Sequence, residues 1–240
     1  MLDNINLQNI LFLDIETVPL YPSFNDAPEV IKQLWLKKEK NISREPIEPG
    51  EVYRQAGIYA EFGKIICVSC GFMTGEGKLR IKSFFGDDEK VLLTGFAETL
   101  NKFCSSPGKL LCAHNGKEFD FPYLGRRMIV NQITLPSVLD LAGKKPWEIS
   151  HLDTMELWKF GDHKAYTSLL LLATILGIPT PKDDIDGSMV GEVYWKEKNL
   201  QRIAIYCQKD VLTVAQIMMR YKNMPLLKEG DIEIVTQEQL

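Results

Sequence analysis

The order of strand-like and helix-like segments constrains the fold of this chain more than any other feature. Two apolar segments, 65–72 and 79–84, flank Thr74-Gly75-Glu76-Gly77, a turn sequence that predicts an antiparallel hairpin. We expect further strands at 10–16, 110–113 and near 149–152, and helices at 28–39, 51–60, 87–103, 121–133, 153–160, 168–176 and 200–221. Because strands come first and helices alternate later, we expect an α/β fold with a mixed sheet in one domain spanning residues 1–240.

Composition and charge exclude several classes of protein. With 45% hydrophobic and 10% aromatic residues the chain is not disordered, and no segment approaches the ~20 apolar residues that span a membrane. Five cysteines, an odd number without a disulfide spacing, favour a reducing cytoplasm. A protein that holds duplex DNA is normally basic, but this chain has a net charge of −4, so any role with nucleic acid must depend on a local site.

Several common chemical motifs are absent. Cys67 and Cys70 form a C-x-x-C, but at strand periodicity they point to opposite faces, and we interpret them as core residues. The histidines lack the i,i+4 spacing of a zinc helix, and no G-x-S-x-G motif is present. The carboxylates of Asp and Glu therefore remain as the candidate functional groups of this sequence.

The first acidic cluster lies in the strand-like segment 11–17. Residues two apart on a strand share a face, so Asp14 and Glu16 point the same way from an otherwise apolar strand. Buried like charges are costly unless protons, basic groups or a metal ion neutralise them. A D-x-E pair is expected about once by chance in a chain of this length, so a solvated strand end is the alternative interpretation.

The second cluster follows the strand expected at 110–113. A loop begins with His114-Asn115-Gly116 and ends at Asp120, next to a helix start marked by Pro122. Taken alone, this segment favours a helix N-cap over a chemical role for Asp120.

The third cluster is Tyr206-x-x-x-Asp210 on the helix expected at 200–221. The apolar stripe of this helix is made of Ile203, Cys207, Val214, Ile217 and Tyr221. Asp210 falls inside the stripe, and no Lys or Arg stands at positions 206, 207, 213 or 214 to neutralise it. An acidic residue on the core-facing side of a helix favours a functional role.

Together the three clusters resemble the DEDD superfamily of 3′→5′ exonucleases, in the subgroup with a tyrosine in its third motif. D-x-E on the first strand, H-N-x-x-x-F-D before a helix and Y-x-x-x-D on a late helix occur in the family's order. The sibling subgroup has a histidine where this chain has Ile205. More narrowly, the sequence is similar to stand-alone bacterial relatives of the proofreading domain of family-B DNA polymerases. Residues 21–61 match nothing in that domain's core, and we interpret 20–62 as an insertion of unknown role.

The resemblance implies an RNase H-like fold, with helices on both sides of a mixed sheet, and a catalytic set of Asp14, Glu16, Asp120, Tyr206 and Asp210. It implies that the four carboxylates hold two Mg²⁺ or Mn²⁺ ions, hard cations that assist phosphodiester hydrolysis. Tyr206 would orient the attacking water, since the high pKa of a phenol makes it a poor base. The expected products are nucleoside 5′-monophosphates.

The resemblance also suggests substrate contacts. Thr17 follows the first motif, where the family's backbone approaches the terminal nucleotide, and Asn115 matches a residue near the strand end. Phe121 is expected either to stack on terminal bases or to belong to the core at the helix entry. Lys117 and Arg126 are available for phosphate contacts.

The leading function is a metal-dependent 3′→5′ exonuclease acting on the 3′ end of single-stranded nucleic acid, with DNA favoured over RNA. One alternative is an exoribonuclease that trims RNA 3′ ends, since the same site accommodates either sugar. The other is a non-catalytic 3′-end-binding module, against which the complete acidic set argues.

Overall fold

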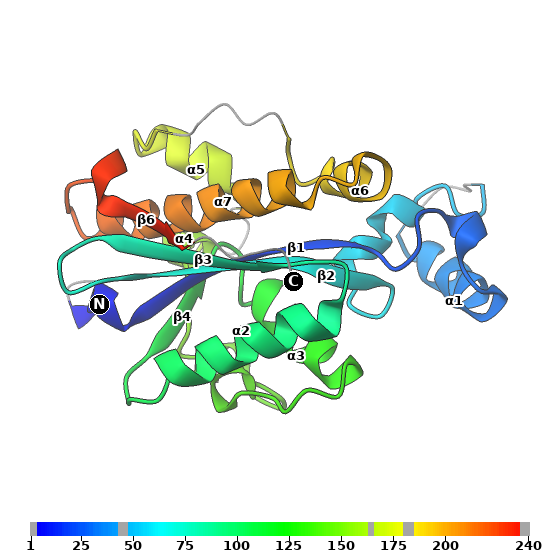
Figure 1. The fold of residues 1–240 in the computed structure, drawn as a ribbon, viewed down its shortest axis with the longest axis horizontal. Helices are drawn as coiled ribbons and strands as arrows, with labels where there is room; N and C mark the ends of the chain where they lie inside the picture. The colour runs from blue at the N-terminus through cyan, green and yellow to red at the C-terminus, as the bar shows by residue number, and fades with distance from the viewer. Residues whose placement is uncertain (1–3, 43–47, 163–165, 180–184, 236–240) are drawn as a thin grey trace.

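The structure is a computed structural model that describes residues 4–42, 48–162, 166–179 and 185–235. Its centre is a six-stranded sheet in the order β5-β4-β1-β2-β3-β6 (Figure 1). The strands are β1 (Ile10–Pro19), β2 (Gly63–Met73), β3 (Leu79–Phe85), β4 (Leu110–Ala113), β5 (Leu152–Asp153) and β6 (Ile232–Val235). The pairs β1–β2 and β2–β3 are antiparallel, whereas β1–β4, β4–β5 and β3–β6 are parallel. The sheet is therefore mixed.

Helices cover both faces of the sheet. α2 (Glu89–Phe103) and α3 (Asp120–Val130) lie on one face, and α7 (Leu200–Tyr221) lies on the other with α5 (Leu169–Ile175) outside it (Figure 1). The chain also forms α1 (Glu29–Glu39), α4 (Thr154–Lys159), α6 (Val190–Glu192) and a π-helical turn, Val193–Glu197. This arrangement confirms the expected α/β class. No helix among the described ranges is long and apolar enough to cross a membrane.

The alternation along β1 decides which way its carboxylates point. Leu13 packs in the core between the sheet and α2 and α3, whereas Phe12 packs in the core beneath α7. Asp14 and Glu16 follow Phe12 by two and four residues, so their side chains lie on the same face of the sheet as Phe12 and point toward α7. The same rule separates Cys67 from Cys70, which lie in the cores of opposite faces, as the sequence predicts.

The segment between Pro19 and Gly63 projects from one end of the molecule (Figure 1). It has its own aromatic cluster, in which the Trp35 ring meets the rings of Tyr53, Tyr59 and Phe62 edge-on. Two hydrogen bonds hold it against α3, from the Tyr123 hydroxyl to Gly57 O at 2.8 Å and from Arg127 Nη1 to Ala60 O at 2.8 Å. A Cβ at Gly63 would lie 2.4 Å from the Tyr123 hydroxyl, so this junction requires glycine.

Three details differ from the expectations. The helix expected at 51–60 is wrong, because this segment forms a short 3-10 helix, Tyr53–Ile58, in which Gly57 lies against the backbone of Val18. The sequence also gave no sign of β6, where Glu233 interrupts the apolar pattern and forms ion pairs with Lys78 and Arg80. The helical turns at 190–197 were likewise not expected.

Candidate active site

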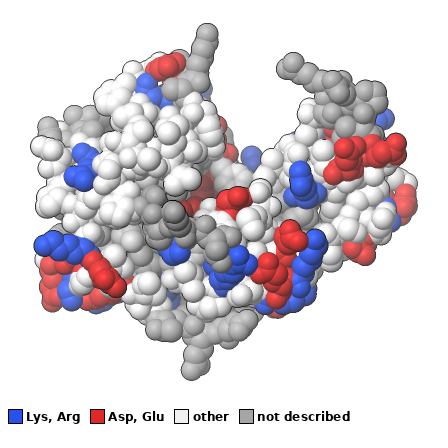
Figure 2. All heavy atoms as spheres, turned by 90° about the horizontal axis from the view of Figure 1, so that it is seen from above, with Lys and Arg blue, Asp and Glu red and all other residues white. Residues whose placement is uncertain are grey.

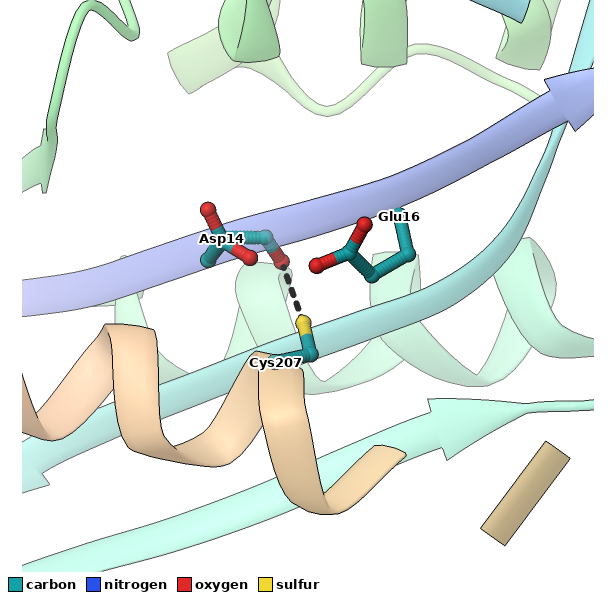
Figure 3. A group of neighbouring side chains, drawn as sticks. All are labelled: Asp14, Glu16 and Cys207. Atoms are coloured by element: carbon teal, nitrogen blue, oxygen red, sulfur yellow. Dashed lines mark hydrogen bonds between the residues drawn. The ribbon is translucent and has the colours of Figure 1, made fainter. Parts of the chain in front are cut away.

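Two carboxylates from β1 and a thiol from α7 form the centre of the site (Figure 3). Glu16 is buried, and Asp14 is partly buried with an Oδ2 atom that is buried without a hydrogen-bond partner. Cys207 donates its thiol hydrogen to Asp14 O at 3.4 Å. Single ligand atoms of Asp14, Glu16 and Cys207 lie within 4.8 Å of one another. The β1–β2 register shifts directly after Glu16, as β-bulges beside active sites often do.

The other predicted carboxylates act on this pair at short range. Burial raises the pKa of Asp14 well above its usual value, and the charges of Glu16, Asp210 and Asp120 raise it further. Burial also raises the pKa of Glu16, with added repulsion from Asp210 and Asp120. The structure therefore brings the four acids of the three sequence clusters into one site.

Asp120 reaches this site from the first residue of α3. Its N-cap position is occupied by Phe119, so the N-cap interpretation of Asp120 is wrong. Burial raises the pKa of Asp120 to about 7, and the charges of Asp153 and Asp210 act in the same direction. Backbone N–H groups of Asp120 itself and of Ile15 oppose this shift by stabilising the carboxylate.

The loop before Asp120 is held by a residue that sequence reasoning missed. Asp153, which is buried at the end of β5, accepts hydrogen bonds from the backbone N–H groups of Asn115 at 3.0 Å and Lys117 at 3.1 Å. It also caps α4 by accepting from Met155 and Glu156. The signal for this cap was present in the sequence, as an Asp before a helix with Glu three residues later.

Tyr206 and Asp210 lie one turn apart on α7, and the Tyr206 hydroxyl donates a hydrogen bond to the Asp210 carboxylate. Burial raises the pKa of Tyr206 far above its usual value, and the charges of Asp210, Glu16 and Asp14 add to this effect. Tyr206 therefore remains protonated at any working pH. Both residues are partly buried, whereas the neighbouring stripe residues Ile203 and Cys207 are fully buried.

The three residues expected to contact the substrate, Thr17, Asn115 and Phe121, differ in their burial. Thr17 is partly buried on β1, and Asn115 is partly buried with φ at 63° and an Oδ1 atom that is buried without a partner. Phe121 is fully buried in the core, and its ring meets the His151 ring edge-on at 5.2 Å. Its ring has no surface to offer a base, so the stacking interpretation of Phe121 is wrong and the core interpretation is correct.

The donor set fits a hard divalent cation. The site offers several carboxylate oxygens, one of which is buried and unpaired. Burial, and after it the neighbouring acidic groups, raise the pKa of both Asp14 and Glu16. Such a concentration of negative charge is stable only with protons or cations. In the space-filling view, Asp and Glu atoms lie in the depth of a hollow on the face seen from above (Figure 2).

A buried cluster of carboxylates can hold the divalent ions that assist phosphodiester hydrolysis. Residues 58–233 match the model of a family described as predicted 3'-5' exonuclease related to the exonuclease domain of PolB. The chain belongs to this family. The match includes Asp120, Tyr206 and Asp210 and begins after the first acidic cluster.

One solved structure shows the same fold at a TM-score of 0.50, and a second is similar at a lower score. The family B DNA polymerase of the hyperthermophilic archaeon Pyrobaculum calidifontis is similar over 88% of this chain, with 18% identity and a TM-score of 0.50, and the chain spans 24% of that polymerase's length. E. coli Exonuclease I in complex with a dT13 oligonucleotide is similar over 81% of this chain and 42% of its own, at 10% identity and a TM-score of 0.41. No curated protein sequence matches the chain. The fold is therefore RNase H-like, as expected.

Proposed function

We propose that this chain is a divalent-metal-dependent 3′→5′ exonuclease of the tyrosine subgroup, which degrades single-stranded nucleic acid, DNA in preference to RNA, to nucleoside 5′-monophosphates. The observation that carries the proposal is the convergence of Asp14, Glu16, Asp120 and Asp210 from β1, α3 and α7 on one buried site. Membership of a family related to a polymerase exonuclease domain supports the reaction class.

The carboxylates would hold two Mg²⁺ or Mn²⁺ ions, with Asp14 central because it feels the charges of the other three. When bound, such ions polarise the phosphate and its attacking water and stabilise the charge on the departing 3′ oxygen. The Cys207 thiol lies beside the two β1 carboxylates, and its hydrogen bond to Asp14 O helps to fix the strand at this point.

The residues of the chain have separable tasks. Tyr206 stays protonated, so it orients a water molecule through its hydroxyl and does not accept a proton. Asp120 is positioned toward the other carboxylates because it is the first residue of α3 and follows the loop that Asp153 holds by two hydrogen bonds. Thr17, which follows Glu16 in β1, and Asn115, in the loop before Asp120, are proposed to contact the terminal nucleotide.

The domain organisation belongs to the same proposal. We take residues 1–240 as one exonuclease domain, with 20–62 as an insertion that follows β1 and precedes β2. All but the last five residues of this insertion lie outside the family match, which begins at residue 58.

Directional degradation is the test. The purified protein with Mg²⁺ or Mn²⁺ should shorten 5′-labelled single-stranded DNA stepwise from its 3′ end and release mononucleotides, and EDTA should stop it. RNA of the same sequence should be degraded more slowly. Asp210→Asn should be nearly inactive, and the exposed Asp140→Asn serves as the matched control. Cleavage of circular single-stranded DNA at the rate of linear DNA, or binding without cleavage, would refute the proposal.

A further inference from the structure

A pocket close to the carboxylate site has two aromatic side chains that are almost fully exposed. The pocket has a volume of about 780 Å³, and its lining includes Lys117, Trp147, His151, Phe160 and Tyr221. Trp147 is 78% exposed and Phe160 is 85% exposed. A single exposed apolar side chain is ordinary, but two large rings on one concave surface mark a binding site.

The backbone at Phe160 adds an independent sign. Phe160 ends α4 in the left-handed conformation, with φ at 45° and ψ at 35°, and Gly161 follows with φ at 89°. This conformation suits Gly or Asn and is strained for a bulky side chain. A phenylalanine that is both strained and exposed at this position contributes little to folding, and such outliers cluster at functional sites.

The pocket adjoins the loop that carries Asp120. Lys117 lines the pocket and precedes Asp120 by three residues, so their backbones are at most ~10 Å apart. Asp153 also lines the pocket and is close enough for its charge to raise the pKa of Asp120. Tyr221, which also lines the pocket, follows Asp210 by eleven residues on α7, about 16 Å along the helix. At the ~3.4 Å spacing of a stacked strand, these separations of about 10 to 16 Å correspond to roughly three to five nucleotides.

Lysines lie near the Trp147 ring and near His151. The Lys145 ammonium lies 5.3 Å from the centroid of the Trp147 ring, and Lys117 pairs with Glu156 at 2.6 Å. Lys144 and Lys117 are both close enough to His151 to lower its pKa, after the larger effect of its burial. The negative charge of Asp153 is satisfied by four backbone N–H groups. Aromatic rings interleaved with cations are the surface that binds unpaired bases and their phosphates.

We propose that this Trp147 pocket binds bases of the single strand upstream of its 3′ end, roughly three to five nucleotides from the carboxylates, by stacking on Trp147 and Phe160. The inference rests on the proposed function, because it assumes that the 3′ end lies at the carboxylates. The other conceivable occupant is an extended peptide that pairs with β5, which is the edge strand of the sheet. The lysines and the exposed rings favour the nucleic acid.

The first experiment measures binding without cleavage. The anisotropy of a labelled ten-nucleotide single strand is titrated in EDTA with wild type, Trp147→Ala and Phe160→Asn. Each variant should bind about 5- to 100-fold more weakly, the loss expected for one base stacked on an aromatic ring. Phe160→Asn should melt no lower than wild type, because Asn tolerates the left-handed conformation. Ile129→Ala, 66% exposed on α3 and outside the pocket lining, is the matched control and should bind like wild type.

The second experiment locates the contact. Abasic sites placed at the third to fifth nucleotides from the 3′ end should weaken binding to wild type. They should not weaken it further in Trp147→Ala, because the effects of groups in contact are non-additive. Equal binding by wild type and both variants, or no measurable binding by wild type, would overturn the inference. The inference would also fail if Trp147→Ala lost the same affinity for intact strands as for abasic strands. Sensitivity to Trp147→Ala for an extended peptide, with none for the strand, would assign the pocket to a peptide.

These outcomes are separate from those of the proposed function. A strand that is degraded with Mg²⁺ but binds independently of Trp147 refutes the pocket and leaves the exonuclease intact. A strand that binds through Trp147 but is never degraded refutes the exonuclease and leaves the pocket intact.

Discussion

Replacing Asp120 with Asn should stabilise the metal-free protein at alkaline pH. Asp120 has a pKa of about 7 in the folded chain, chiefly because it is buried, against an ordinary value of 3.8. This difference of about 3 pKa units corresponds to about 4 kcal/mol of unfolding free energy, at ~1.36 kcal/mol per unit. The carboxylate is 3% exposed, so solvent screens little of this cost. Because the acids of the site share their repulsion, about 4 kcal/mol is the ceiling for one substitution.

The sign of the pH dependence follows from the raised pKa. Below about pH 4 the carboxyl is protonated in both states and costs nothing. Between about pH 4 and 7 the folded state binds more protons than the unfolded state, so the unfolding free energy falls as the pH rises. Above about pH 7 the full cost is present. Raising the pH from about 5 to about 8 should therefore lower the unfolding free energy of the metal-free wild type by up to about 3 kcal/mol through Asp120 alone.

The assay is a set of urea and thermal melts of wild type and Asp120→Asn in EDTA and in Mg²⁺, at about pH 5 and 8. At about pH 8 in EDTA the variant should melt higher by up to roughly 8 to 16 °C, at ~2–4 °C per kcal/mol for a chain of this size. Mg²⁺ should stabilise wild type more than the variant, because the variant has lost a ligand. Asp140→Asn, an exposed acid, is the control and should change neither value. A wild type in EDTA that is equally stable at both pH values, or a variant less stable at about pH 8, would refute this reasoning.

Four further predictions concern single residues. Tyr206→Phe should slow turnover roughly 10- to 1,000-fold and keep Mg²⁺ affinity, because it removes only a hydroxyl that orients water. Asp14→Ala should abolish both turnover and Mg²⁺ binding by calorimetry, and equal loss of affinity in the two variants would contradict these separate roles. Arg127→Met should lower the unfolding free energy, measured in urea, by about 3–5 kcal/mol. In the wild type Arg127 pairs with Glu89 at 2.6 Å, and the variant leaves the Glu89 carboxylate charged, buried and without this partner. A loss below about 1 kcal/mol, the value of a surface ion pair, would show that other groups compensate the Glu89 charge. Asp153→Ala should lower the unfolding free energy by about 2–4 kcal/mol, because four N–H groups lose their acceptor, and Asp153→Asn should recover part of this loss.

Local patterns predicted the elements that are long and regular. The helix expected at 200–221 coincides with α7, since its apolar stripe is continuous and Asn199 caps its start. The hairpin of β2 and β3 was marked by its turn, in which Gly77 adopts φ of 80°. β6 could not be predicted, because Ile232 is only partly buried and Ile234 is 54% exposed, and the strand forms by pairing with β3, more than 150 residues earlier in the chain.

The site was predictable in part for the same reason. Asp14 and Glu16 were recognisable by strand parity, and Asp210 by its place in an apolar stripe, both of which are local patterns. The position of Phe121 was left open, because only the packing of α3 against the sheet and His151 decides that its ring points into the core. Cys207 was interpreted as part of the stripe, and its position beside Asp14 depends on how α7 crosses β1.

Burial alone does not distinguish the reactive acids of this chain from the structural ones. Glu89 and Asp153 are as buried as Glu16, but Glu89 accepts hydrogen bonds from Arg127 and the Ile65 N–H, and both oxygens of Asp153 accept from backbone N–H groups. Asp14 instead has a buried oxygen without a partner. A buried carboxylate with its lone pairs satisfied stabilises the fold, whereas one with a free oxygen is costly until a cation binds. Apart from Met155, which follows Asp153 by two residues, these partners are 24 to 38 residues away along the chain, so the distinction becomes visible only in the folded structure.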